Sequence, residues 1–143
     1  MSRRISIASA LAEKFKEING ESPYKVNLYN NSSNRLKFWD ECSSFPALFV
    51  VAGSESREYL PASFTWCFLN LSIKIYCKGE DSQTELEDLI EDVENVLDST
   101  LGRITFNETK STEEISVTSI TTDEGLLAPY AVGEINILVR YPR

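Results

Sequence analysis

Histidine is absent from the 143 residues. Catalytic triads of the Ser-His-Asp type, Cys-His pairs and histidine-ligated zinc sites therefore cannot be built, because each needs an imidazole as base or ligand. The six glycines are scattered, and neither GxGxxG nor GxxxxGK[ST] occurs. Two major phosphate-binding signatures are thus missing as well. These absences exclude many common enzyme classes.

Long apolar runs and paired cysteine motifs are also lacking. No segment approaches the roughly 18 apolar residues that span a bilayer, and charged residues interrupt Ile5 to Gly20, so we expect neither a signal peptide nor a membrane role. Cys42, Cys67 and Cys77 show no CxxC spacing. We interpret them as small buried side chains in a reducing compartment.

The negative charge is confined to one segment. The net charge is −8, and Glu80 to Asp98 contains nine acids without a Lys or Arg, so the remainder carries about +1. A chain of this kind has no general attraction for phosphate backbones. The sequence therefore predicts no specific nucleic-acid binding.

Apolar periodicity predicts a single α+β domain over residues 1–143. We expect an antiparallel or mixed β-sheet with two amphipathic helices packed on one face, and with long hairpin or loop extensions. One helix should start at Ser2 or Ser6 and end at Asn19; Ser82 and Glu85 form a capping box for the second, which Leu101-Gly102-Arg103 ends. The predicted strands are 24–29, 47–52, 63–77, 104–106, 115–121 and 134–141, and the main loops are 30–44, 54–62 and 121–133.

The strand Ser63–Cys77 carries the clearest pattern. Alternate residues from Cys67 to Cys77 are apolar, as one buried face requires. The opposite face begins with Phe64, Trp66 and Phe68 and then becomes polar. A loop or the segment 35–45 could cover these aromatics, or they could contact another subunit; both interpretations stay open. At roughly 50 Å the strand could project beyond the core.

The second helix combines an apolar stripe with an acidic face. The acidic positions singled out are Glu85, Asp88, Glu91 and Asp92. Paired carboxylates could serve a glycosidase or a hard cation, but solvation of a surface helix produces the same pattern. An acidic face could also meet a basic partner or line an electronegative pore. We predict no catalytic residue, no metal and no cofactor.

The order of these segments resembles the tail terminator (tail completion) proteins of long-tailed bacteriophages. The resemblance rests on Phe45 to Val51, Leu60-Pro61, Leu69 to Tyr76, the helix Leu86 to Leu97, Thr121 to Gly125 and Ile135 to Tyr141. It implies a non-enzymatic virion protein, assembled in the host cytoplasm, that forms a hexameric ring at the head-proximal end of the tail tube. There it would stop tail polymerisation and present a surface for the head.

The resemblance also implies the partners: copies of the same chain, the tail tube protein and a head-completion or connector protein, with DNA able to pass through the ring. Candidate interface residues come from 54–62, the aromatic strand face and 123–130: Glu55, Arg57, Glu58, Tyr59, Phe64, Trp66, Phe68, Asp123, Glu124, Leu126, Leu127 and Tyr130. The alternatives are another head-tail joining or minor tail protein of related fold, or a small protein- or ligand-binding module.

Overall fold

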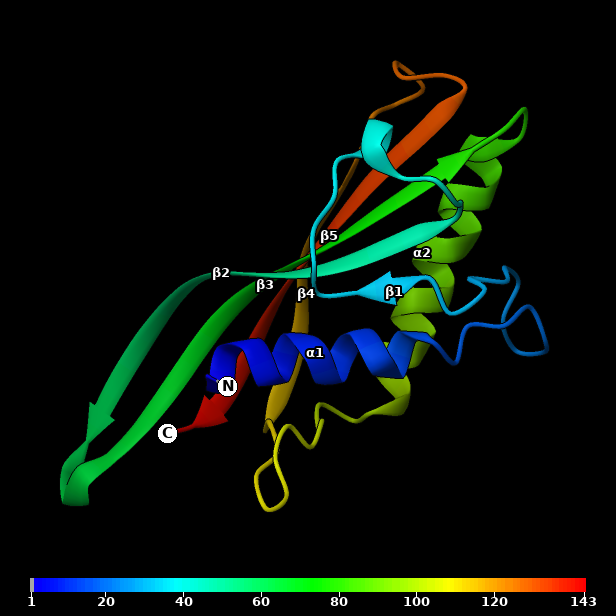
Figure 1. The fold of residues 1–143 in the computed structure, drawn as a ribbon. Coiled ribbons are helices and arrows are strands. Elements are labelled where there is room, and N and C mark those ends of the chain that lie inside the picture. The colour runs from blue at the N-terminus through cyan, green and yellow to red at the C-terminus, as the bar shows by residue number, and fades with distance from the viewer. Residues whose placement is uncertain (1) are drawn as a thin grey trace.

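Five strands form one mixed sheet in the order β1-β2-β3-β5-β4. The structure, a computed structural model, describes residues 2–143 (Figure 1). In chain order the elements are α1 (Arg3–Phe15), β1 (Ser32–Ser33), the 3₁₀ helix η1 (Trp39–Glu41), β2 (Ala47–Leu60), the 3₁₀ helix η2 (Pro61–Ser63), β3 (Phe64–Lys78), α2 (Ser82–Ser99), β4 (Glu114–Thr122) and β5 (Tyr130–Pro142). In the described part of the chain, β1 and β2 are the one pair of strands that run parallel. The predicted α+β class is confirmed.

Both helices pack on the same face of the sheet, as predicted. One hydrophobic cluster contains Leu11 and Phe15 of α1, Leu86 and Val93 of α2, and the alternate residues of β3 from Cys67 to Cys77. Each of those β3 residues is at most 1% exposed. The period of two that the sequence shows in this strand therefore reflects burial beneath two helices.

A glycine in β5 lets α2 approach the sheet closely. A Cβ at Gly133 would lie 2.9 Å from Leu86 Cδ1, closer than two carbon atoms can pack. At the other end of the core, α1 starts after Ser2, whose hydroxyl accepts a hydrogen bond from Ile5 N at 3.1 Å. This helix ends at Phe15, four residues before the predicted end.

The segment Tyr24–Tyr29 was predicted as a strand, and the structure shows that this is wrong. The carboxylate of Asp92 on α2 accepts hydrogen bonds from the backbone N–H groups of Lys25, at 3.0 Å to each oxygen, and of Val26, at 2.9 Å. These donors are therefore satisfied by a side chain and need no neighbouring strand. Asp92 is 0% exposed, so its predicted place on the acidic outer face is also wrong.

The predicted loop 54–62 is also wrong, because most of it is strand. After a register shift between Ala52 and Glu55, β2 continues antiparallel to β3 as far as Leu60. A β-bulge of this kind lets a strand bend without ending. The polar residues of this segment lie on a hairpin that extends beyond the body of the protein (Figure 1).

Residues 104–106 do not form the predicted strand. The segment has a single bridge, between Thr105 and Ser111. The side chain of Thr112 holds it instead, accepting from Ile104 N at 2.9 Å and donating to Gly102 O at 2.8 Å. Hydrogen bonds between a nearby side chain and the backbone thus take the place of the backbone hydrogen bonds of a β-sheet.

Two predicted boundaries also shift. The N-cap of α2 is Asp81, with no side-chain cap bond, and Ser82 is the first helical residue, so the capping box of Ser82 and Glu85 does not form. The predicted loop 121–133 shortens to 123–129, because β4 and β5 extend into it and pair with each other.

The remaining predictions concern cysteines and membranes. Cys67 and Cys77 are buried as expected, Cys42 is half-buried, and no disulfide forms within residues 2–143. Burial raises the pKa of the Cys77 thiol well above its usual range. None of the helices described between residues 2 and 143 is long and apolar enough to cross a membrane.

We predict that Asp92→Ala lowers the free energy of unfolding by about 2 to 3 kcal/mol, because it leaves the buried N–H group of Val26 and the partly buried N–H group of Lys25 without their acceptor. Urea denaturation followed by circular dichroism measures this change. The control is Asp88→Ala, one turn earlier on the same helix, where the carboxylate is half-exposed and has no hydrogen bond within residues 2–143. Equal stabilities of the two variants would contradict the role of Asp92.

Candidate assembly surfaces

A two-stranded hairpin projects from the sheet. We call residues 55–68 the hairpin extension; in it, β2 pairs with β3 from Glu55–Leu69 out to Leu60–Phe64. The next strand, β5, pairs with β3 only as far as Trp66, opposite Pro142. The tip is therefore supported by its own two strands, and Figure 1 shows it far from both helices. The sequence predicted that part of β3 would project, and it does.

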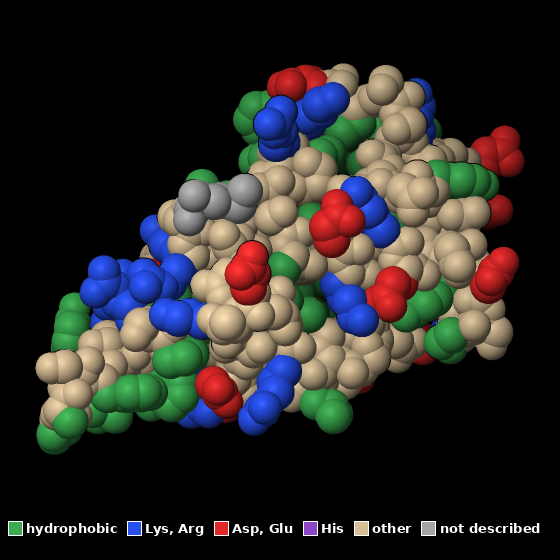
Figure 2. Space-filling model, turned by 60° about the horizontal axis from the view of Figure 1, so that its bottom comes forward, with side chains coloured by type: hydrophobic (Ala, Val, Ile, Leu, Met, Phe, Trp, Pro, Cys, Tyr) green, Lys and Arg blue, Asp and Glu red, His purple; other side chains and the backbone are tan. Residues whose placement is uncertain are grey.

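The aromatic residues of the hairpin extension form an uncovered patch. Phe64 and Trp66 pack edge to face with ring centroids 5.0 Å apart, and Leu60 pairs opposite Phe64. Phe64 is 41% exposed and Leu60 37%. We call Leu60, Phe64, Trp66 and Phe68 the aromatic patch. Figure 2 shows hydrophobic side chains gathered along this arm of the molecule.

The segment 35–45 covers a different part of the sheet. Trp39, Cys42 and Phe45 pack against Phe49 and Tyr76, at the opposite end of the same face. No part of residues 2–143 covers the aromatic patch in this way. The sequence had left open whether segment 35–45 covers the aromatic residues of the hairpin. The structure shows that this segment does not cover them.

Arg140 on β5 supports the patch, and the sequence did not identify it. Its guanidinium lies 4.6 Å from the centroid of the Trp66 ring, and its Nη2 lies 3.7 Å from Glu114 Oε2. Stacking on a guanidinium fixes the ring orientation at a half-exposed site. Arg140 lies opposite Phe68, and no sequence signal shows this register.

The helix-facing side of the hairpin extension is held by Glu55. The Tyr141 hydroxyl donates a hydrogen bond to Glu55 Oε1, and Arg57 Nε donates to Oε2 at 2.9 Å. The Glu55 side chain is only 7% exposed. Burial, reinforced by this carboxylate, raises the pKa of the Tyr141 hydroxyl above its usual range. Glu55, predicted at an interface, therefore acts inside the chain and ties the hairpin to β5.

The hairpin tip presents the other predicted residues of this region. Glu58 lies opposite Trp66 and is exposed, and Tyr59 is 74% exposed. At the turn, Ala62 and Ser63 have φ angles of 67° and 62°, in the left-handed region that non-glycine residues seldom adopt. The turn thus holds a specific, slightly strained shape.

The second predicted loop, 123–129, lies at the other end of the sheet. Gly79 at the end of β3 donates a backbone hydrogen bond to Pro129 O at 3.0 Å. Since the 15 residues of β3 span about 50 Å at 3.3 Å per residue, this loop and the hairpin tip are too far apart to form one surface. The structure therefore separates the predicted interface residues into two groups.

Within that loop, Asp123 organises the backbone. It accepts hydrogen bonds from Gln83 Nε2 at 3.2 Å, Leu127 N at 3.0 Å and Val132 N at 3.1 Å. Burial alone would raise the pKa of Asp123, but these donors hold it below its usual value. The adjacent Leu126 is 85% exposed, and Glu124 is also exposed.

Tyr130 follows directly after this loop, at the start of β5. Its ring lies 4.7 Å from the Trp39 ring and 5.8 Å from that of Phe45, between centroids, and Lys78 lies over it. The residue therefore joins segment 35–45 to β5. It is half-buried, so only part of the residue is available to a partner.

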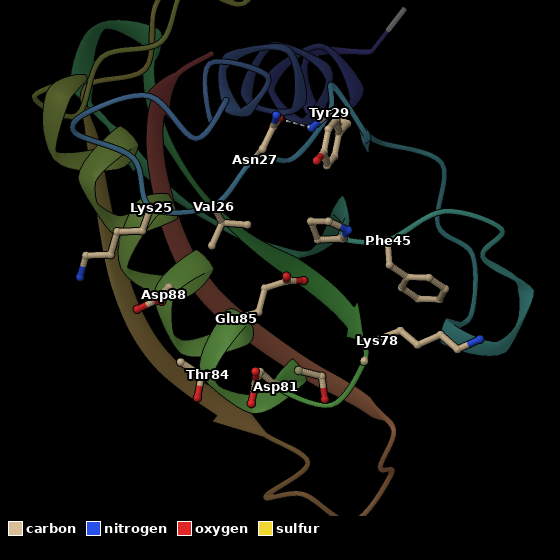
Figure 3. A pocket seen from close by; sticks show the side chains of 13 residues that line it. Lys25, Val26, Asn27, Tyr29, Phe45, Lys78, Asp81, Thr84, Glu85 and Asp88 are labelled. Atoms are coloured by element: carbon tan, nitrogen blue, oxygen red, sulfur yellow. Dashed lines mark hydrogen bonds between the residues drawn. The ribbon is translucent and has the colours of Figure 1, made fainter.

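The acidic helix borders an open cavity of 580 Å³. Figure 3 shows Glu85 pointing into this cavity and Lys25 extending away from it. Lys25 Nζ lies 3.1 Å from Glu91 Oε2, and this bond raises the pKa of Lys25. Asp88 also lines the cavity, whereas Asp92 is buried beneath it. Within residues 2–143 no three acidic, cysteine or histidine side chains are placed to hold a metal ion.

Comparisons with known proteins agree with this geometry. A family model described as Bacteriophage Tail Tube Terminator Protein matches residues 1–143. The chain is 39% identical over 153 residues to the tail tube terminator protein p142 of Escherichia phage T5, covering 99% of this chain and 94% of that protein.

A solved structure from the virion of a native gene transfer agent particle has a similar fold. It has a TM-score of 0.63 at 9% identity and covers 99% of this chain and 100% of that one. This likeness concerns the fold alone. The family match and the phage T5 relative decide the identity: the chain belongs to the bacteriophage tail tube terminator family, a family of structural proteins of the phage tail.

Proposed function

We propose that the chain forms a ring of six subunits on the head-proximal end of the tail tube, stops tube polymerisation and provides the surface to which the head joins. Its partners would be copies of itself, the tail tube protein and a head-completion or connector protein. The family and the name of the phage T5 relative support the terminating role. The ring is supported by the shape and surface of the chain itself.

The observation that carries this proposal is the hairpin extension with its aromatic patch. An isolated monomer would keep Phe64, Leu60 and part of Trp66 in water on an arm distant from the core. Aromatic side chains are enriched at the centres of protein interfaces, where they bury large areas and lose few rotamers. We therefore assign the patch to a contact with another subunit.

The separation of the two candidate surfaces also supports the proposal. A terminator must bind the tube on one side and accept a different partner on the other. Apart from the aromatic patch, the hairpin tip exposes Tyr59, and at the opposite end of the sheet the loop 123–129 exposes Leu126. This arrangement gives each partner its own surface. No reaction is required for this role, and we expect no catalytic activity.

The free edge of β4 adds a further contact region. Among residues 2–143 this strand pairs with β5 alone, and Val117 and Ile120 are each 41% exposed. Unpaired edges of sheets expose backbone donors and acceptors that another chain can bind. We propose that the ring covers this edge.

We predict that the double substitution Phe64→Ala/Trp66→Ala shifts the purified protein from a ring to smaller species, because the contact loses two aromatic anchors. Size-exclusion chromatography with light scattering measures the mass. The matched control is Phe38→Ala, which removes a 64% exposed aromatic outside the hairpin extension. A double variant with the mass of the wild type and an unchanged melting temperature would argue against the patch as a contact.

In the phage, we expect the same double substitution to yield tails of variable, increased length without heads, because tube growth is no longer stopped. Electron microscopy of lysates gives the distribution of tail lengths. The control phage carries Phe38→Ala and should make tails of normal length. Uniform tails joined to heads in the double variant would contradict the proposed role of the hairpin extension.

A further inference from the structure

The acids of α2 lie largely along one stripe. Glu87, Glu91, Glu94 and Asp98 are spaced by four, three and four residues, which places them on one side of the helix over about 16 Å. Glu91 pairs with Lys25, and no ion pair forms at the other three within residues 2–143. We call these four residues the acidic stripe. Its charges have no counterpart on their own helix, because Glu80 to Asp98 contains no Lys or Arg.

Arginines collect at the base of the hairpin extension. Arg4 donates a hydrogen bond to Gly53 O, Arg57 lies on β2 opposite Cys67, and Arg143 N donates to Thr65 O at 3.1 Å. Arg3 precedes Arg4 at the start of α1 and is exposed. We call Arg3, Arg4, Arg57 and Arg143 the arginine patch. Figure 2 shows Lys and Arg side chains clustered beside the hydrophobic side chains of the hairpin extension.

The arginine patch has little internal compensation. Glu55 binds Arg57, but Arg3 and Arg143 form no ion pair within residues 2–143. The first turn of α1 contains Arg3 and Arg4 and no acid, and the last turn of α2 contains no base. Both patterns oppose the helix dipole, which favours acids at the start of a helix and bases at its end. A partner of opposite charge, bound from outside the chain, would offset the unfavourable charge at each of these two helix ends.

The two charged surfaces cannot meet within one chain. In Figure 1, α2 runs along one side of the sheet, whereas the hairpin extension and both termini lie at the opposite end. Two complementary surfaces at different places on a subunit produce a head-to-tail contact, which gives a ring when the rotation from one subunit to the next closes and an open filament when it does not.

We propose that the arginine patch of one subunit binds the acidic stripe of the next subunit in the ring. This inference rests on the proposed ring and specifies its contact. A second copy fits the patch because it supplies unpaired carboxylates in a row. DNA is the competing ligand for arginines, but a net charge of −8 repels it at long range.

The test uses two charge-reversed variants. Arg3→Glu/Arg143→Glu changes the charge of the patch, counted together with the ion-paired Glu55, from +3 to −1. Glu87→Lys/Glu94→Lys changes the charge of the stripe, counted together with the ion-paired Lys25, from −3 to +1. Arg4 and Arg57 are left intact because they hold Gly53 and Glu55. Sedimentation velocity at low ionic strength should show self-association of each variant alone weakened about tenfold or more, because like charges now face each other.

Mixing the two variants should restore the ring. In a ring in which the two variants alternate, the changed patch of one variant faces the changed stripe of the other. The native patch of the second variant faces the native stripe of the first, so every contact is again between opposite charges. Restored infectivity on co-expression of the two variants, in phage lacking its own copy, would show the same pairing during assembly. Recovery in the mixture cannot come from a merely structural defect in either variant.

Matched controls carry equal charge changes elsewhere. Lys37→Glu/Lys110→Glu matches the patch reversal, and Glu21→Lys/Glu108→Lys matches the stripe reversal; none of these four residues forms an ion pair within residues 2–143. Both controls should assemble like the wild type. Equal weakening in controls and variants would overturn the proposal, because net charge alone would then explain the loss.

The remaining outcomes separate this inference from the proposed function. If the wild type forms rings and both reversals assemble normally, or if the mixture does not recover, the pairing is wrong and the ring stands. If the wild type forms no ring, both are wrong. If the patch reversal abolishes binding of duplex DNA and leaves the ring intact, the patch is a phosphate-binding surface and the proposal is overturned.

Discussion

The structure depends on a mismatch between the length of β3 and the length of the helices that cover it. β3 pairs with β2 along nearly its whole length, and its alternate residues from Cys67 to Cys77 are buried beneath α1 and α2. The 15 residues of the strand span about 50 Å, whereas the 13 residues of α1 and the 18 of α2 span only about 20 and 27 Å. The sheet therefore extends beyond its cover, and the outer part of the hairpin extension, around its turn, is the part that no helix covers within residues 2–143.

The other face of the sheet, which no helix covers, follows from the same constraint. Near Tyr76 the segment 35–45 covers it, in the middle it is polar, with Ser72 bound to Asn136, and at the hairpin it is aromatic. Only the aromatic end combines exposure with large apolar side chains. Glu55 and Tyr141 hold this end in a fixed orientation, so the patch is presented by a supported strand pair.

Much of the fold could be predicted from the sequence where one face of an element is buried. β3, β5 and both helices show the period of their burial, and the prediction of both helices on one face is confirmed. Residues 54–60 lacked such a signal, because a projecting hairpin buries little on either side. Asp92 looked like its exposed acidic neighbours, since its role depends on backbone N–H groups 66 and 67 residues away.

The sequence could identify several residues of the candidate surfaces, but not how these residues are arranged in space. The alternation in β3 identified Phe64, Trp66 and Phe68, but the stacking of Arg140 and the distance between the hairpin and loop 123–129 depend on strand register. Conversely, Glu55 and Asp123 were selected as charged residues of apparent loops. Both turned out to bind groups within the chain, because a local sequence does not show where its charges find partners.

The most direct measurement is hydrogen–deuterium exchange of the backbone amides of residues 55–68, compared between the purified chain at low concentration and the protein in assembled tails. If a neighbouring subunit covers the hairpin extension, exchange there should slow strongly on assembly, while amides in the centre of β3 remain protected in both states. Equal exchange of residues 55–68 in the two states would contradict the claim that this part of the sheet is completed by another subunit.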